Sequence, residues 1–145
     1  MPRRMLHTMI RVRDLQKSIE WYQRVLGMKL QRTADFPEEQ FTLAFLGYGH
    51  EGEATVLELT YNYGEHNYTH GTGYGHICIG VDDVRAEIER FKALGSEYVP
   101  VDYVSDDNFM AFIKDPDGYS IELLNEQRMV SDALRSAKEQ GLPKE

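Results

Sequence analysis

The chain has 145 residues and 41% of them are hydrophobic, enough to build a packed core in one domain or in two small halves. Its formal net charge of −8 argues against a nucleic-acid backbone or an anionic membrane surface as the main partner, and no apolar run approaches the roughly 18 residues of a membrane span. Because Cys78 is the single cysteine and no apolar segment follows the basic N-terminus, the sequence predicts a cytoplasmic protein without an internal disulfide or a signal peptide.

The first half of the chain predicts one strand, one helix and three further strands. Residues 7–14 alternate between an apolar face and a polar face that includes His7 and Arg11. Apolar side chains then recur at helical spacing, with Asp14 as the N-cap and Gly27 as the stop. Turn residues separate the three strands, which are predicted at residues 28–33, 40–49 and 54–62.

The second half repeats this order. The strand at residues 75–83 matches the first one at an offset of 69 (76 − 7), which equates His7 with His76, and a helix follows at residues 83–95. Three more strands are predicted at residues 97–103, 108–115 and 119–126. The repeat therefore predicts an α+β fold made of two β-α-β-β-β modules, residues 1–66 and 67–126.

Residues 127–145 are predicted to form a C-terminal helix and tail. The helix is amphipathic, with Val130, Leu134 and Ala137 on one face, and Gly141 ends it.

A glutamate interrupts the last strand of each module. Glu58 lies in "ATVLELTY" and Glu122 in "GYSIELLN", each pointing away from the leucines and isoleucine beside it. The repeat equates these two glutamates as it equates His7 with His76. Two imidazoles and two carboxylates suit an octahedral site for a divalent first-row metal. The alternative is that the carboxylates are solvated and the histidines structural, as single residues of these types in strands usually are.

The other three histidines, His50, His66 and His70, lie in glycine-rich segments and are predicted to be surface residues.

Six segments resemble the motifs of glyoxalase I (lactoylglutathione lyase) of the vicinal-oxygen-chelate superfamily. They are "LHTMIRV", "LGMKL", "FTLAFLGYG", "VLELTYNYG", "YGHICIGV" and "DPDGYSIELL", and they cover residues 5 to about 126 in the family's order. The resemblance implies paired β-α-β-β-β modules and a homodimer with its sites at the interface. Each site would combine the first half of one chain with the second half of the other.

The resemblance also implies an activity and a set of site residues. The metal ligands would be His7, Glu58, His76 and Glu122. The substrate would be the hemithioacetal of methylglyoxal and a thiol, and proton transfer through an enediolate would give the S-D-lactoyl thioester, which detoxifies methylglyoxal. Glu122 would be the base and Glu58 its pseudo-symmetric partner. Arg11 and Asn62 would bind the γ-glutamyl end of the thiol, and His76 would also face the substrate.

The chain departs from the family at a loop that precedes the seventh predicted strand, residues 108–115. Relatives carry lysine there against the glycyl carboxylate of glutathione, whereas this chain has Asp102, Asp106 and Asp107. The acidic loop resembles trypanothione-dependent glyoxalase I, whose thiol carries a cationic spermidine. The alternative is an acidic loop that faces only solvent. The lack of long insertions resembles the nickel- or cobalt-activated class, although these ligands also suit zinc.

Three rival functions share the predicted fold. An extradiol dioxygenase would use two histidines and one carboxylate around Fe(II), so the presence of both Glu58 and Glu122 argues against it. A methylmalonyl-CoA epimerase would lack the pair Arg11 and Asn62. A drug-binding protein would need a cavity and no metal ligands.

Overall fold

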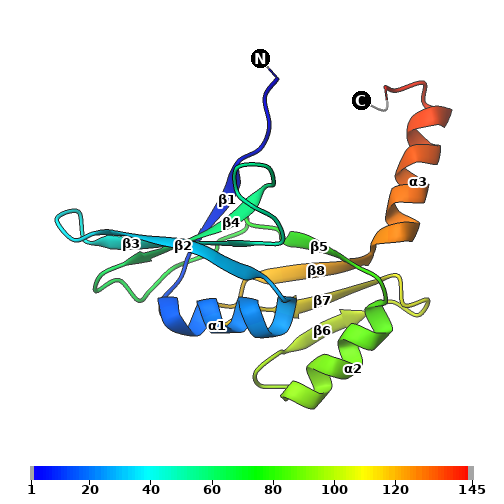
Figure 1. The fold of residues 1–145 in the computed structure, drawn as a ribbon. Coiled ribbons are helices and arrows are strands. Elements are labelled where there is room, and N and C mark those ends of the chain that lie inside the picture. The colour runs from blue at the N-terminus through cyan, green and yellow to red at the C-terminus, as the bar shows by residue number, and fades with distance from the viewer. Residues whose placement is uncertain (1, 144–145) are drawn as a thin grey trace. The chain divides into compact units, whose positions relative to one another are not determined.

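The computed structural model describes residues 2–143 and divides the chain into two compact units, residues 1–71 and 72–145. Met1, in the predicted first module, and residues 144–145, in the predicted tail, lie outside the described residues. Each unit has a four-stranded sheet and a helix that follows its first strand (Figure 1). The predicted α+β fold of two β-α-β-β-β modules with a C-terminal helix is confirmed.

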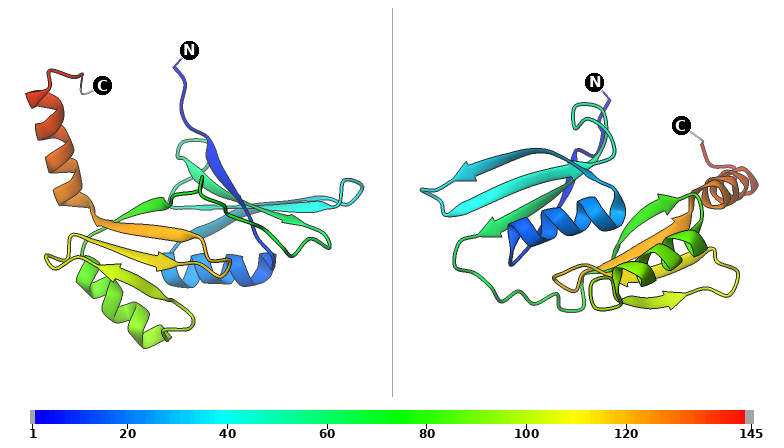
Figure 2. Two further views of the ribbon diagram at one scale, coloured as in Figure 1. Left: turned by 180° about the vertical axis from the view of Figure 1, so that it is seen from behind. Right: turned by 60° about the horizontal axis from the view of Figure 1, so that its bottom comes forward.

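The first unit contains five elements: β1 (His7–Arg11), α1 (Leu15–Leu26), β2 (Lys29–Phe36), β3 (Phe41–Gly47) and β4 (Val56–Asn62). Its strand order is β1-β4-β3-β2, with β1 parallel to β4 and the other pairs antiparallel. The second unit contains β5 (Ile77–Val81), α2 (Val84–Leu94), β6 (Val101–Val104), β7 (Met110–Lys114), β8 (Ser120–Asn125) and α3 (Glu126–Glu139). Its order, β5-β8-β7-β6, repeats that of the first sheet (Figure 2).

The predicted signals at the ends of the first helix are confirmed. The Asp14 carboxylate accepts a hydrogen bond from the backbone N–H of Lys17 at 3.1 Å, and Gly27 takes the left-handed conformation, with φ of 67°, that ends a helix readily. The buried face of α1 includes Trp21 and Tyr22, which pack edge to face with centroids 4.9 Å apart. This helix covers one face of the first sheet.

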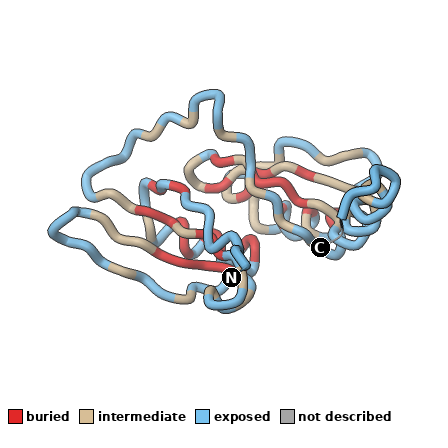
Figure 3. The backbone as a smooth tube through the Cα atoms, turned by 90° about the horizontal axis from the view of Figure 1, so that it is seen from above, coloured by how far each residue is buried: buried red, intermediate tan, exposed pale blue. Residues whose placement is uncertain are grey.

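Strand alternation places the site residues on the opposite face. In β4, Leu57 and Leu59 are buried on the helix side, so Glu58 must point to the other side of the sheet. In β8, Ile121 and Leu123 are buried in the same way around Glu122. The buried residues follow the strands of both sheets and the helices α1 and α2 (Figure 3).

Several predicted elements differ in extent; the strand predicted at residues 28–33, for example, continues to Phe36 in β2. The strand predicted at residues 97–103 begins only at Val101, because the backbone N–H groups of Tyr98 and Val99 both bond back to the carbonyl of Gly95 and form a turn. The C-terminal helix begins one residue earlier than predicted, at Glu126, because the Asn125 side chain caps it by accepting from the backbone N–H of Arg128 at 2.9 Å.

The C-terminal helix α3 buries none of its residues in the described chain. Its predicted apolar face is present, but Val130 is 43% exposed and Leu134 is 48% exposed. None of the described helices combines the length and the apolar character that crossing a membrane requires.

Candidate active site

In the first unit, parallel pairing of β1 and β4 brings His7 to Glu58. Met9 lies opposite Glu58 in the register, so His7 is one alternating position away on the same face. His7 Nε2 and Glu58 Oε1 are 3.1 Å apart. The second carboxylate oxygen accepts a hydrogen bond from the Thr60 hydroxyl at 3.2 Å. The histidine side chain is 41% exposed and the glutamate 12%, so the pair is open to solvent on the imidazole side.

The second unit repeats this geometry. Parallel pairing of β5 and β8 puts Cys78 opposite Glu122, and His76 lies two residues before Cys78. His76 Nε2 and Glu122 Oε1 are 3.2 Å apart, and the exposed fractions of the two side chains equal those of the first pair. The equivalence of the two histidines and of the two glutamates, which the sequence repeat predicted, is therefore also a geometric equivalence.

An aromatic ring supports each histidine. Phe45 lies opposite Glu58 in the register and meets His7 edge to face, with centroids 5.9 Å apart. Phe112 lies opposite Glu122 and meets His76 in the same way at 5.2 Å. These contacts restrict the orientation of the imidazoles. The sequence interpretation left both phenylalanines out of the site, although they match one another within the repeated Ala-Phe dipeptide.

The first pair has a cationic neighbour that the sequence interpretation also left out. The Arg32 guanidinium lies 3.9 Å from the centroid of the Phe45 ring and forms an ion pair with Glu51. The hydrogen bond from Arg32 lowers the pKa of the Glu51 carboxyl, and the same bond raises the pKa of Arg32. No short motif marks this contact, because it joins residues 19 positions apart across β2 and the loop after β3.

The two glutamates differ in what else holds them. Glu58 is fixed at both oxygens, by His7 and by Thr60. Leu124 stands in β8 where Thr60 stands in β4, so Glu122 has no hydroxyl donor at the matching position. Its other polar neighbour is the Cys78 thiol, a weak donor. Partial burial, followed by the charge and hydrogen bond of Glu122, raises the pKa of Cys78 to about 12, so this thiol stays protonated near neutral pH.

Arg11 and Asn62 lie at the carboxyl ends of β1 and β4. Arg11 pairs in the register with Thr60, and alternation puts Arg11 on the face of His7 and Asn62 on the face of Glu58. The Asn62 amide nitrogen donates to the Tyr68 hydroxyl at 3.2 Å. The two side chains predicted to bind the γ-glutamyl end therefore share one face of one sheet with the first histidine–glutamate pair.

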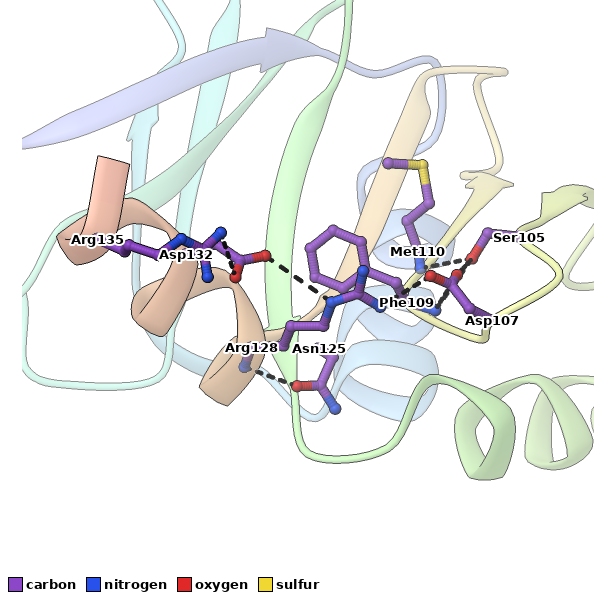
Figure 4. Close-up of polar contacts among 8 residues, drawn as sticks. All are labelled: Ser105, Asp107, Phe109, Met110, Asn125, Arg128, Asp132 and Arg135. Carbon is purple, nitrogen blue, oxygen red and sulfur yellow. Dashed lines mark hydrogen bonds and ion pairs between the residues drawn. The ribbon is translucent and has the colours of Figure 1, made fainter. Parts of the chain in front are cut away.

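Two of the three aspartates of the acidic loop are already paired within the chain. Asp102 lies 3.4 Å from Lys114 of β7. Asp107 accepts from Arg128 of α3 at 2.8 Å and from the Ser105 hydroxyl at 2.8 Å (Figure 4). These hydrogen bonds lower the pKa of Asp107 to about 2, and the bond from Arg128 has the largest effect. Among residues 2–143 no ion pair or hydrogen bond is found for the Asp106 side chain. We expected three carboxylates to act together on a cationic tail. In the structure Lys114 of β7 neutralises Asp102 and Arg128 of α3 neutralises Asp107, so Asp106 alone stays unpaired among the described residues.

The remaining histidines lie outside both pairs. His50 is exposed and its Nδ1 accepts from the backbone N–H of Gly52 at 2.9 Å, and His66 is exposed as predicted. His70 is half-buried, so it is less exposed than the sequence suggested.

Each unit thus offers a bidentate set of one imidazole nitrogen and one carboxylate. Within residues 2–143, no group of three or more histidine, cysteine, aspartate or glutamate side chains is close enough together to hold a metal ion. The donor types of each set fit a divalent first-row metal.

Comparison with known proteins identifies the class. The family Glyoxalase/Bleomycin resistance protein/Dioxygenase superfamily matches residues 4–123. The chain belongs to this superfamily, as its paired modules indicate.

Within the superfamily, the chain is about half identical to several glyoxalase I proteins. It is 55% identical to the trypanothione-dependent glyoxalase I of Leishmania major, with a TM-score of 0.92 over 97% of this chain and 99% of that one. It is 53% identical to a lactoylglutathione lyase of Haemophilus influenzae, over 82% of this chain and 90% of that protein. It is 50% identical to a probable lactoylglutathione lyase of Vibrio parahaemolyticus, over 86% and 92%. The resemblance found in the sequence motifs is confirmed.

Proposed function

We propose that this protein is a glyoxalase I, a lyase that converts the hemithioacetal of methylglyoxal and a thiol to the S-D-lactoyl thioester. The observation that carries the proposal is the presence of two similar histidine–glutamate contacts, at 3.1 and 3.2 Å, in a chain about half identical to lactoylglutathione lyases. Detoxification of methylglyoxal in the cytoplasm is the corresponding cellular role.

His7 and Glu58 of one chain, with His76 and Glu122 of a second copy, would hold one divalent ion in a homodimer. Two donors in each unit are too few for a stable site, so two sets must combine. Bound there, the ion would draw charge from the substrate oxygens and so acidify the adjacent C–H bond. Nickel is our first expectation, with cobalt or zinc as alternatives for the same ligands.

Glu122 is the better candidate for the base that carries the proton from C1 to C2. A base must leave its resting contacts to reach the substrate, and Glu122 lacks the hydroxyl donor that Thr60 provides to Glu58. Both glutamate side chains are only 12% exposed, and such a water-poor setting keeps a transferred proton from exchanging with solvent. The missing hydroxyl donor is therefore what distinguishes Glu122. Glu58 is then mainly a ligand.

The thiol is held at two ends. Arg11 and Asn62 would bind the γ-glutamyl group, because a guanidinium and an amide can together satisfy an α-carboxylate and an α-amine. At the other end, Asp106 is the carboxylate without a described partner, and it would favour a cationic tail. Trypanothione is therefore proposed as a better thiol than glutathione. The high similarity to the trypanothione-dependent Leishmania major protein supports the same choice.

One assay tests the proposal. The purified protein, stripped of metal and then loaded with Ni²⁺, Co²⁺ or Zn²⁺ in turn, is given the methylglyoxal hemithioacetals of glutathione and of trypanothione, and thioester formation is followed. We expect metal-dependent turnover of both thiols and faster turnover of trypanothione at low salt. Absence of thioester with every metal and both thiols would instead favour the dioxygenase, epimerase or drug-binding members of the fold.

A further inference from the structure

Residue Arg128, in the first turn of α3, connects the C-terminal helix to the loop between β6 and β7. Its guanidinium donates to Asp107 at 2.8 Å and lies 4.2 Å from the centroid of the Phe109 ring (Figure 4). The ion pair spans 21 positions of the chain, so it is a tertiary contact. These two contacts join α3 to the loop of residues 105–109.

That loop leads directly to the second histidine–glutamate pair. It ends at β7, in which Phe112 contacts His76 edge to face and lies opposite Glu122. Phe112 is two residues beyond Met110, the start of β7, a distance of about 7 Å along an extended strand. We take the tail of a substrate held at His76 and Glu122 to extend from Phe112 toward this loop, where it would meet the charges of the loop.

The loop is itself well ordered by local bonds. The Ser105 hydroxyl accepts from the backbone N–H groups of Phe109 and Met110, at 3.0 and 3.1 Å, and donates to Asp107. Asp107 also accepts from the N–H of Phe109 at 3.2 Å. Because these bonds do not involve Arg128, the loop keeps its own hydrogen bonds when the arginine is replaced. The main consequence of such a replacement is then a change of charge.

We propose that Arg128 is a specificity-determining residue for the thiol: it neutralises Asp107, leaving Asp106 as the one uncompensated carboxylate of the loop. The inference rests on the proposed glyoxalase function. Two carboxylates and one guanidinium give the group Asp106, Asp107 and Arg128 a net charge of −1. Asp132, which is 3.8 Å from Arg128, also pairs with Arg135 at 3.2 Å, so its charge stays matched without Arg128.

The selectivity for a cationic over an anionic thiol tail should therefore follow the net charge of this group. Arg128→Met keeps an unbranched apolar side chain beside the loop and makes the charge −2. Asp107→Asn makes it zero, and the double variant restores −1. One unit charge at ~9 Å in water changes the binding of a singly charged tail by a factor of about 2.2, and the cationic and anionic tails shift in opposite directions. The selectivity ratio should thus change about fivefold for each step at low salt.

The experiment measures kcat/KM for the hemithioacetals of trypanothione and of glutathione with each metal-loaded variant. We expect the ratio to rise about fivefold in Arg128→Met, to fall about fivefold in Asp107→Asn, and to return to the wild-type value in the double variant. A purely structural role for Arg128 would leave the double variant as altered as the single one. All differences should shrink in ~1 M salt, where screening is strong.

Arg90 of α2 provides the matched control. It also pairs with a carboxylate, Glu87 at 2.7 Å, and its guanidinium lies near an aromatic ring, Phe91 at 5.1 Å, but both are residues of its own helix. Arg90→Met should leave the ratio unchanged. The inference is overturned if the ratio does not move in Arg128→Met, or does not return in the double variant, while the wild type turns over both substrates. A wild type that turns over neither substrate overturns the proposed function as well.

Binding gives a second readout that does not need catalysis. Calorimetric titration of each variant with the S-methylated, unreactive forms of the two thiols should give the same order of selectivity as the kinetic ratio. Equal selectivity in all variants would refute a role of Arg128 in recognising the tail even if the kinetic ratios differ.

Discussion

Replacing Glu122 by glutamine tests the different roles assigned to the two glutamates. Glutamine has nearly the same volume and keeps one oxygen that can bind a metal, but its amide cannot accept the proton from C1. Positioned acid–base groups contribute about 10²–10⁴-fold to rate. We therefore expect Glu122→Gln to lower kcat by about that factor, or about 3–5 kcal/mol of transition-state stabilisation.

Glu58→Gln is the matched control for this substitution. Its carboxylate makes the same contact with histidine, 3.1 Å against 3.2 Å, and has the same side-chain exposure of 12%. What differs is the Thr60 hydroxyl, which holds Glu58 in place as a ligand. Glu58→Gln should therefore lose more metal, and at saturating metal its kcat should fall less than that of Glu122→Gln.

The assay combines metal titration with steady-state kinetics of the same preparations. Metal content is measured after dialysis, and kcat is measured at saturating metal and substrate. Near-normal kcat in Glu122→Gln, together with a deep loss in Glu58→Gln, would refute the assignment and make Glu58 the base. Equal losses in both variants would show that the contact with Thr60 does not distinguish the two glutamates.

Three further predictions concern the sharing of the site between chains, the ion pair of Asp107 and the cap of α1. Mixing Glu58→Gln chains with Glu122→Gln chains should restore activity in verified heterodimers. If each site is shared between the chains, one of the two sites carries both substitutions and the other carries neither. Heterodimers without recovered activity would argue for a site within one chain. The folded-state pKa of Asp107 is lowered from 3.8 to about 2, so its contribution to stability is complete above about pH 4 and is lost as pH falls through about 2. Arg128→Met should raise the pKa of this carboxyl in an NMR titration. An unchanged titration would refute the ion pair. Asp14→Ala removes the cap of α1 and should lower the free energy of unfolding by about 1 kcal/mol in urea titrations, whereas no loss of stability would show that the carboxylate leaves the N-terminus of the helix in solution.

Local patterns in the sequence were sufficient to predict the elements of both modules and the equivalence of their histidine–glutamate sets. Helical spacing and strand alternation are set by residues a few positions apart, so the helix from Leu15 to Leu26 and its cap at Asp14 could be read directly. The internal repeat then equated His7 with His76 and Glu58 with Glu122. Parallel pairing of the first and last strands of each module turned that equivalence into two similar contacts.

Tertiary structure alone decided the charge of the acidic loop. In the sequence, Asp102, Asp106 and Asp107 are three carboxylates without a nearby base, and they predicted a strongly acidic surface. Their cations come from 12 and 21 positions away, one on β7 and one on α3. Which charges meet depends on strand register and on where a helix begins, and the energy of such exposed pairs is too small to leave a pattern in local sequence. For the same reason Thr60, which distinguishes the two glutamates, became a site residue only when the fold placed its hydroxyl at Glu58.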